Sequence, residues 1–147
     1  ECATIIYYDF DFAIKQIIDS ELSYKETQRR KEKKILDKDF NWYEELRKSF
    51  TLYIDEKWIR NVAKLSHSLS NDNIKTIYDI YGDLNSVILT LSKSLPEEDT
   101  HFVFASFINK HINYIPKGKI DNVKDCLNKD VKEVMDKLMQ LSDIENK

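Results

Sequence analysis

The stretch NDNIKTIYDIYGDLNSVILTLSKSL, residues 71–95, decides the fold class of this chain. Its apolar residues recur at alternating spacings of three and four, which places them on one face of a helix. They are Ile74, Ile77, Tyr81, Leu84, Ile88, Leu91 and Leu95. Asn71 or Asp72 can cap the start of this helix, and Pro96 ends it. A helix with one apolar face must bury that face, and this spacing favours neighbouring helices packed at a shallow angle.

Two further helices are expected after this stretch. Pro96 opens the first, because its missing N–H is not needed there, and the acidic residues 97–99 suit the positive N-terminus of a helix. Its apolar face is Val103, Phe104, Phe107, Ile108, His111, Ile112 and Ile115. The turn residues 116–118 then end it. The second runs over about 120–141, with a face of Ile120, Val123, Leu127, Val131, Val134, Leu138 and Leu141.

The middle of the chain predicts one long helix over 41–69. Asp39 can cap its start, or Asn41 can do so with Glu44 three residues on as a capping box. Its apolar residues lie on one face whose position shifts gradually around the helix axis along the segment. They are Tyr43, Leu46, Phe50, Ile54, Ile59, Val62, Leu65 and Leu69. Asp55 marks the place where a kink would fall.

The N-terminal segment fits two kinds of structure. Residues 5–12 alternate like a strand, but the apolar residues up to Ile18 also recur at helical spacing. Helix is favoured because no second strand is available for pairing. Residues 25–34 contain no apolar side chain. Residues 23–38 are therefore either an exposed helical extension or a loop.

Together these segments predict an all-α, single-domain antiparallel bundle of four to five helices over residues 1–147, because short connections force neighbouring helices to run antiparallel. The composition excludes other classes. Two glycines cannot supply the phosphate-binding loops of nucleotide folds or the many turns of a β-sandwich. Charged residues interrupt every apolar run before it reaches the length of a membrane span.

The charge balance argues against nucleic acid as a partner. Lys and Arg number 23 against 26 Asp and Glu, a net charge of −3, whereas binding to phosphates is driven by a basic surplus. The basic run from Lys25 to Lys34 lacks the interleaved aromatic residues that would stack on bases. A solvated face is the favoured interpretation of this run, ahead of a partner-binding patch.

The two cysteines, Cys2 and Cys126, favour a disulfide, with two inert free thiols as the alternative. In a five-helix up-and-down bundle the first and fifth helices are parallel, and both cysteines lie near helix N-termini, so their sulfur atoms are expected at the same end. A disulfide indicates an oxidising compartment. We therefore expect a secreted protein or one displayed at the extracellular surface.

The sequence contains no recognisable catalytic or metal-binding motif. The histidines are His67, His101 and His111, and none stands beside a nucleophile in sequence. Glu97 or Glu98 could form a metal-ligand pair with His101, but no second helix offers a matching pair. We therefore expect no catalytic residues, no metal and no cofactor, and a protein that is not an enzyme.

The aromatic residues are the most informative side chains for function. On the expected long helix, Trp42, Tyr53 and Trp58 do not all share the core face, which makes them candidates for an exposed protein-binding patch. For the aromatic residues as a set, an ordinary core with tyrosine hydroxyls reaching the surface is the favoured interpretation, ahead of such a patch. The remaining alternative is a pocket for a small hydrophobic ligand near Tyr81, Gly82 and Phe107, since a glycine beside Tyr81 suggests that a chain or ring lies close. The sequence thus favours a protein-binding protein, with a carrier of a hydrophobic small molecule as the alternative.

Overall fold

The computed structural model describes residues 1–93, 95–116 and 123–142. Within these ranges the protein has six α-helices, one 3-10 helix and no strand apart from an isolated bridge between Ile112 and Leu127. The elements are α1 (Cys2–Glu32), α2 (Trp42–Ser49), α3 (Trp58–Lys64), α4 (Asn71–Leu91), α5 (Glu97–His111), η1 (Val123–Cys126) and α6 (Lys129–Leu141). The prediction of an all-α helical bundle is confirmed, although the described residues hold six helices rather than four or five.

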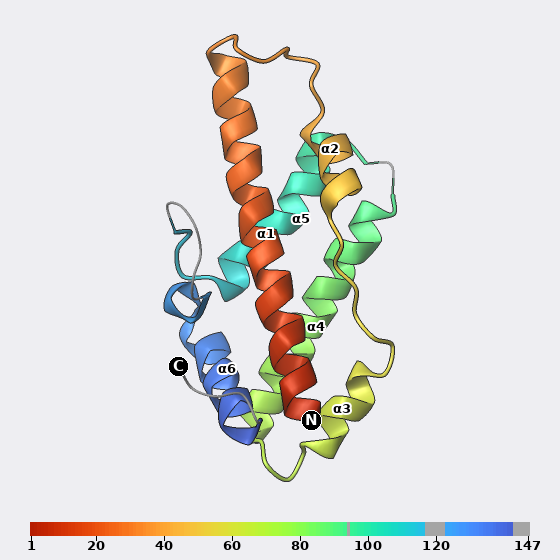
Figure 1. Ribbon diagram of the computed structural model, residues 1–147, viewed down its shortest axis with the longest axis vertical. Helices are drawn as coiled ribbons and strands as arrows, with labels where there is room; N and C mark the ends of the chain where they lie inside the picture. Colours follow the sequence, from red (N-terminus) through yellow and green to blue (C-terminus); the bar gives the residue numbers. More distant parts are fainter. Residues whose placement is uncertain (94, 117–122, 143–147) are drawn as a thin grey trace.

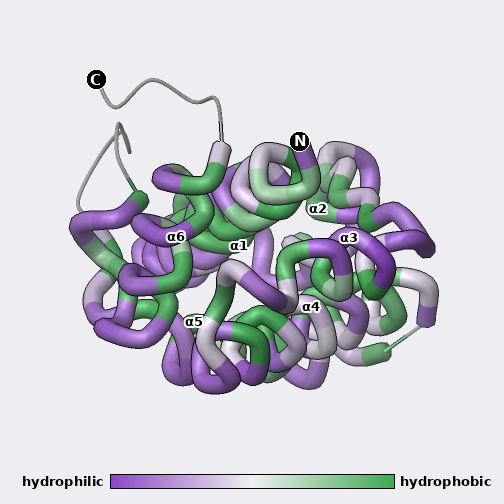
Figure 2. Tube along the Cα trace, turned by 90° about the horizontal axis from the view of Figure 1, so that it is seen from below, coloured by the Kyte–Doolittle hydropathy of each residue, from purple (hydrophilic) through white to green (hydrophobic). Residues whose placement is uncertain are grey.

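The helices form two layers around a common core. Seen along the bundle, α1 lies between α6 and α2, and this layer covers α4 and α5 (Figure 2). α3 packs beside the N-terminal end of α1 (Figure 1). α1 and α4 run in one direction, and α5 and α6 run in the other (Figure 1). None of the helices in the described ranges has the length and the apolar content that crossing a bilayer would require.

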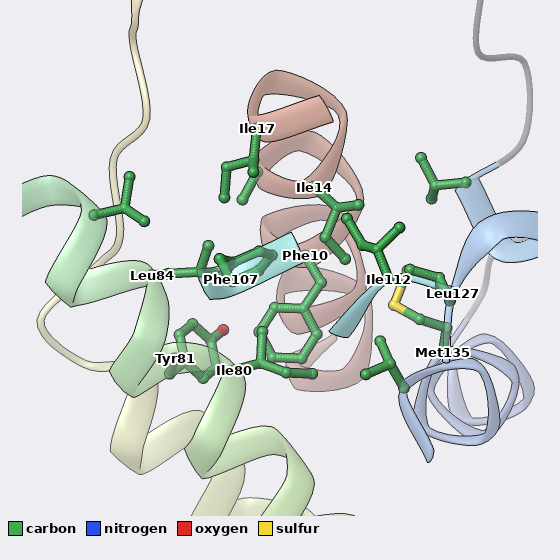
Figure 3. Packing of buried hydrophobic residues seen from close by; sticks show 14 of the residues in the cluster. Phe10, Ile14, Ile17, Ile80, Tyr81, Leu84, Phe107, Ile112, Leu127 and Met135 are labelled. Carbon is green, nitrogen blue, oxygen red and sulfur yellow. The ribbon is translucent and has the colours of Figure 1, made fainter. Parts of the chain in front are cut away.

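The core is built where the inner face of α1 meets α4, α5 and α6 (Figure 3). Its fully buried residues include Phe10, Ile14, Ile17, Ile80, Tyr81 and Leu84. Each buried aliphatic or aromatic side chain contributes roughly 1.5–3 kcal/mol to stability relative to an exposed position. This burial explains why the periodic stretch 71–91 forms a helix as expected.

The N-terminal helix is longer than its apolar part. α1 continues beyond its last apolar residue, Tyr24, to Glu32, which resolves most of residues 23–38 as a helical extension. The helix ends because Lys34 adopts a left-handed conformation, with φ of 60°. The N–H groups of Lys34 and Ile35 then donate to the carbonyls of Lys31 and Arg30, which satisfies the last turn.

The prediction of one long helix over 41–69 is wrong. α2 ends at Ser49, the chain is extended over residues 50–54, and α3 begins only at Trp58. The extended part is rich in β-branched and aromatic residues, which disfavour helix. Asp55 then forms a turn, accepting a 2.8 Å hydrogen bond from the backbone N–H of Lys57 through its side chain.

Several helix ends also differ from expectation. Ser70, rather than Asn71 or Asp72, caps α4 by accepting a hydrogen bond from the N–H of Asn73. α5 ends at His111 instead of continuing to Ile115, because Ile112 turns extended and pairs with Leu127.

The last helix begins later than predicted. The segment from Val123 first forms the short helix η1, and α6 starts at Lys129 after Asn128 in an extended cap conformation. The expected start near Ile120, and the turn residues Lys117 and Gly118, lie outside the described residues.

The predicted disulfide is not present: Cys2 and Cys126 are free thiols. The prediction required an up-and-down order throughout, and that order breaks where α6 follows α5 in the same direction (Figure 1). As a result α1 and α6 are antiparallel, so their N-termini lie at opposite ends of their contact. Each sulfur has its own partner, since Sγ of Cys2 donates to Asn61 Oδ1 and Sγ of Cys126 donates to the Val123 carbonyl.

Candidate interaction surface

Helix α1 carries apolar residues on two opposite faces in its first half. The inner face, which includes Ile6 and Phe10, is completely buried. Ile5, Tyr8 and Phe12 recur on the other side at spacings of three and four and are 45%, 53% and 52% exposed. We call these three residues the α1 outer face. In Figure 2 the first turns of α1 lie at the rim of the molecule.

A partly buried polar and aromatic cluster holds α1 beneath this face. The hydroxyl of Tyr81 donates a 2.8 Å hydrogen bond to Oδ2 of Asp9. The ring of Trp58 stacks on that of Tyr81, with centroids 4.4 Å apart, and so ties α3 to α4 beside α1. Burial raises the pKa of Asp9, and the nearby charge of Asp55 adds to the increase. Burial likewise raises the pKa of the Tyr81 hydroxyl, which stays protonated as a donor.

The segment from residue 51 to 61 runs antiparallel to α1 beside the outer face. The N–H of Thr51 donates to Gln16 Oε1 at 3.1 Å, and Asn61 accepts from Cys2 at the other end. Tyr53 lies in this flanking segment and is 76% exposed. Ile59, in the same segment, is also exposed. The segment that packs along α1 therefore also carries exposed large apolar side chains.

The three aromatic residues predicted to form a protein-binding patch do not share one surface. Trp42 is only 2% exposed and packs edge-on against Phe104 and Tyr24, so its assignment to an exposed patch is wrong. Its burial follows from the docking of α2 on α5, which sequence spacing does not show. Trp58 is half-buried in its stack with Tyr81, and only Tyr53 is freely exposed.

The predicted pocket residues are not gathered around one cavity either. Tyr81 points into the core (Figure 3). Gly82 faces solvent, and nothing beyond its own helix and chain neighbours lies within 4 Å of the place where a Cβ would stand, so the expected close approach is absent. Phe107 is buried and lines an open depression of about 280 Å³ between α4 and α5 together with Phe102 and Val103, but neither Tyr81 nor Gly82 lines it.

A larger depression, of about 520 Å³, lies between α1 and α2. Its lining is largely polar and includes Gln16, Ser20, Ser23 and Glu45. The side-chain nitrogen Nε2 of Gln16 is buried without a hydrogen-bond partner. Such a lining does not suit a hydrophobic ligand.

Two histidines form short contacts with carboxylates. Nε2 of His101 lies 2.6 Å from Glu21 Oε2, and the Tyr24 ring stacks on the imidazole at 3.6 Å. Nε2 of His111 lies 2.6 Å from Asp83 Oδ2. Each contact involves one histidine and one carboxylate. Over residues 1–93, 95–116 and 123–142, no three His, Cys, Asp or Glu side chains converge to hold a metal ion.

The basic run at the end of α1 is partly neutralised. Glu26 accepts hydrogen bonds from Arg29 and Arg30, which lower the pKa of its carboxyl to about 2. Lys31 lies 3.6 Å from Glu97, the residue considered above as a metal ligand. The exposed Arg29 and Arg30 fit the expected solvated face, whereas Lys31 is largely buried in its pair with Glu97.

Comparison with known proteins finds no matching family model, no similar curated protein and no similar solved structure. The candidate surface therefore depends on the geometry of this chain alone. The residues of the α1 outer face were not singled out from the sequence. The sequence signal that identifies them is a second set of apolar residues at helical spacing, on the side of the helix opposite to the first set.

Proposed function

We propose that this chain is a non-enzymatic helical protein that binds another protein through the α1 outer face. The observation that carries the proposal is the half-exposure of Ile5, Tyr8 and Phe12 on a helix whose opposite side is completely buried. Contiguous exposed apolar residues on a folded protein mark interaction sites, and aromatic side chains contribute most of the binding energy at such sites. Tyr53, from the sequence-based set, is exposed in the segment that runs beside α1.

A capture experiment with two matched triple variants tests this proposal. The first variant replaces Ile5, Tyr8 and Phe12 with Ala. The control replaces three other exposed apolar residues with Ala: Ile35, Leu89 and Tyr114. Both should keep the melting temperature of the wild type within a few degrees, because exposed side chains contribute little to folding.

Each protein is immobilised and exposed to extracellular fluid of the source, and the retained proteins are quantified by mass spectrometry. We expect a protein that the wild type and the control retain and the α1 variant loses. Retention by all three, or equal loss from both variants, contradicts the assignment of the α1 outer face.

A carrier of a small hydrophobic molecule is the second candidate, favoured by the apolar walls that Phe102, Val103 and Phe107 give to the depression between α4 and α5. Native mass spectrometry of the purified protein tests it. A bound mass that is lost in Val103→Gln would support a carrier, and a ligand-free protein would contradict it.

An extracellular location is also part of the proposal. The predicted disulfide does not support this location, because both cysteines are free. Probing cells and medium of the source with an antibody tests it directly. A protein confined to the cell interior would contradict it.

A further inference from the structure

The depression between α1 and α2 contains a hydrogen-bond donor that the protein leaves without a partner. Within residues 1–93, 95–116 and 123–142, the side-chain nitrogen Nε2 of Gln16 is the one buried side-chain nitrogen or oxygen that has no hydrogen-bond partner. Most such groups in folded proteins are paired, so this one requires an explanation. Gln16 lines the depression, whose volume of about 520 Å³ lies in the range of about 300–1,000 Å³ that is typical of small-molecule sites.

The orientation of the Gln16 amide is fixed by the backbone. The N–H of Thr51 donates a 3.1 Å hydrogen bond to one end of this amide, and because an N–H only donates, that end is the oxygen Oε1. The other end is therefore the NH₂ group. Because Nε2 is covered, contact with a ligand oxygen requires a small shift of the Gln16 side chain toward the depression, and that contact supplies the missing partner.

The other polar groups around the depression mainly accept hydrogen bonds. Asp19 from α1 and Glu45 from α2 are exposed carboxylates, which accept only when they are ionised. Ser20 and Ser49 already donate their hydroxyl hydrogens to backbone carbonyls of their own helices, so their oxygen atoms remain as acceptors. Lys48 lies at the rim and donates to Glu45 at 3.4 Å. A fitting ligand therefore offers several donors and at least one acceptor.

We propose that this depression binds a neutral polyhydroxylated molecule, a monosaccharide or disaccharide. A hydroxyl group both donates and accepts, so sugar hydroxyls can donate to Asp19 and Glu45 and accept from Nε2 of Gln16. A polyamine has only donors and leaves the amide without a partner. Inorganic phosphate accepts from the amide, but the two carboxylates repel it.

The depression also has an apolar wall. Trp42 and Leu46 are buried and Phe50 is half-buried, and all three line it. Sugar rings carry C–H groups between their hydroxyls, so they can cover this wall while the hydroxyls reach the polar groups. A ligand without hydroxyls would remove the polar groups from water without pairing them, which is unfavourable. Because the carboxylates are exposed and water competes for them, we expect a dissociation constant in the millimolar range.

A nuclear magnetic resonance titration of the isotope-labelled chain tests the inference. The probes are hexoses, N-acetylhexosamines and disaccharides at up to tens of millimolar, with spermidine and inorganic phosphate as the two excluded chemistries. At least one sugar should shift the Gln16 side-chain amide signals and the backbone signals of residues 45–51 saturably, whereas spermidine and phosphate should not. The absence of a saturable shift there with every sugar, or saturation by spermidine or phosphate in place of a sugar, overturns the inference.

Two matched double variants then test the site. Asp19→Ala with Glu45→Ala removes the carboxylates at the depression, and Glu32→Ala with Glu44→Ala removes two exposed carboxylates of the same helices that do not line it. Because all four side chains are exposed, both variants should fold like the wild type. The first should bind the sugar about ten-fold more weakly, and the second should bind it like the wild type. Equal affinities of the two variants overturn the site.

Gln16→Met tests the unpartnered donor. Methionine is similar in length and has no N–H, so the sugar should bind several-fold more weakly. The variant should remain folded, because Thr51 is exposed and its N–H can donate to water once Oε1 is lost. A wild-type affinity in this variant overturns the contribution of Gln16. The site is separate from the α1 outer face, so none of these results depends on a protein partner.

Discussion

The hydroxyl of Tyr81 donates its hydrogen bond to a carboxylate, Oδ2 of Asp9, inside the contact between α4 and α1. Tyr81 is completely buried, so this bond satisfies a donor that would otherwise be costly. The same arrangement is unfavourable for the Asp9 carboxylate, because burial disfavours its charged form and raises its pKa above the usual 3.8.

Replacing Asp9 with Asn should therefore stabilise the protein at neutral pH. A folded-state pKa above the unfolded value means that the contribution of Asp9 to stability is complete below about 3.8 and is lost as the pH rises through its folded pKa. Asn keeps an oxygen that accepts from Tyr81 and carries no charge. Urea unfolding should show a gain for Asp9→Asn at neutral pH that shrinks on acidification.

Tyr81→Phe is the matched control for this effect. It removes the donor to the half-buried Asp9 carboxylate, so it should lower the free energy of unfolding by about 1 kcal/mol. An Asp9→Asn protein that is no more stable than the wild type at neutral pH would mean that the Asp9 carboxylate carries no burial cost.

Lys34→Gly should stabilise the C-terminus of α1. Lys34 has a φ of 60°, a left-handed conformation that costs a residue with a Cβ roughly 1–2 kcal/mol and that glycine adopts freely. We expect the free energy of unfolding to increase by about 1 kcal/mol. Lys33→Gly is the control, because Lys33 has a φ of −83° and glycine there gains nothing. A loss of stability in Lys34→Gly would contradict the left-handed cap.

Gly82→Ala should also stabilise the protein. Gly82 lies inside α4, faces solvent and has open space where a Cβ would be. Alanine is favoured over glycine in a helix interior by about 1 kcal/mol, so thermal unfolding should shift upward by that equivalent. A destabilised variant would instead support the sequence-based expectation that a chain or ring lies against Gly82.

Apolar spacing predicts α4 correctly but predicts the wrong structure for the segment that follows α2. Over α4 the apolar spacing matches one structure only. Phe50 and Ile54 are four apart, which fits a helix, but in an extended chain residues two and four apart also share a face. Leu52 is half-buried and Ile54 is buried, whereas Thr51 and Tyr53 are exposed, so the extended alternative holds. The alternation of Leu52 and Ile54 with Thr51 and Tyr53 can be read from the sequence, and it predicts that the Tyr53 side chain is exposed to solvent.

The candidate surface depended on packing that spacing cannot supply. A helix with two apolar faces is either central in a bundle or exposed on one side, and only the positions of α3 and α6 leave the side with Ile5, Tyr8 and Phe12 uncovered. The same limit applies to Cys126, whose distance from Cys2 depends on the direction in which α6 follows α5.

The free cysteines predict unequal reactivity. Cys126 is buried, and burial raises the pKa of its thiol, whereas Cys2 is only half-buried. Since the thiolate is the reactive form, iodoacetamide should label Cys2 well before Cys126 in the folded protein. Intact mass should be the same with and without reductant. A mass lower by two hydrogens before reduction would reveal a disulfide and contradict the structure.

His111 and Asp83 join α5 to α4 through a contact that depends on the protonation of the imidazole. His111 is 4% exposed, and burial lowers its pKa below 6.5 despite the neighbouring carboxylate. The neutral ring therefore donates its Nε2–H to Asp83. Lys110 lies 3.0 Å from the same oxygen, and the two donors lower the pKa of Asp83 against the effect of its partial burial.

Stability should consequently fall on mild acidification. Because the folded pKa of His111 lies below the unfolded value of 6.5, its contribution is complete above 6.5 and is lost as the pH falls through the folded pKa. Urea unfolding between neutral pH and about pH 5 should show this loss in the wild type. His111→Gln keeps a donor for Asp83 without titrating, so its stability should vary less over the same range. His67→Gln, at an exposed turn, should retain the wild-type slope, and an equal slope in His111→Gln would assign the pH dependence to another group.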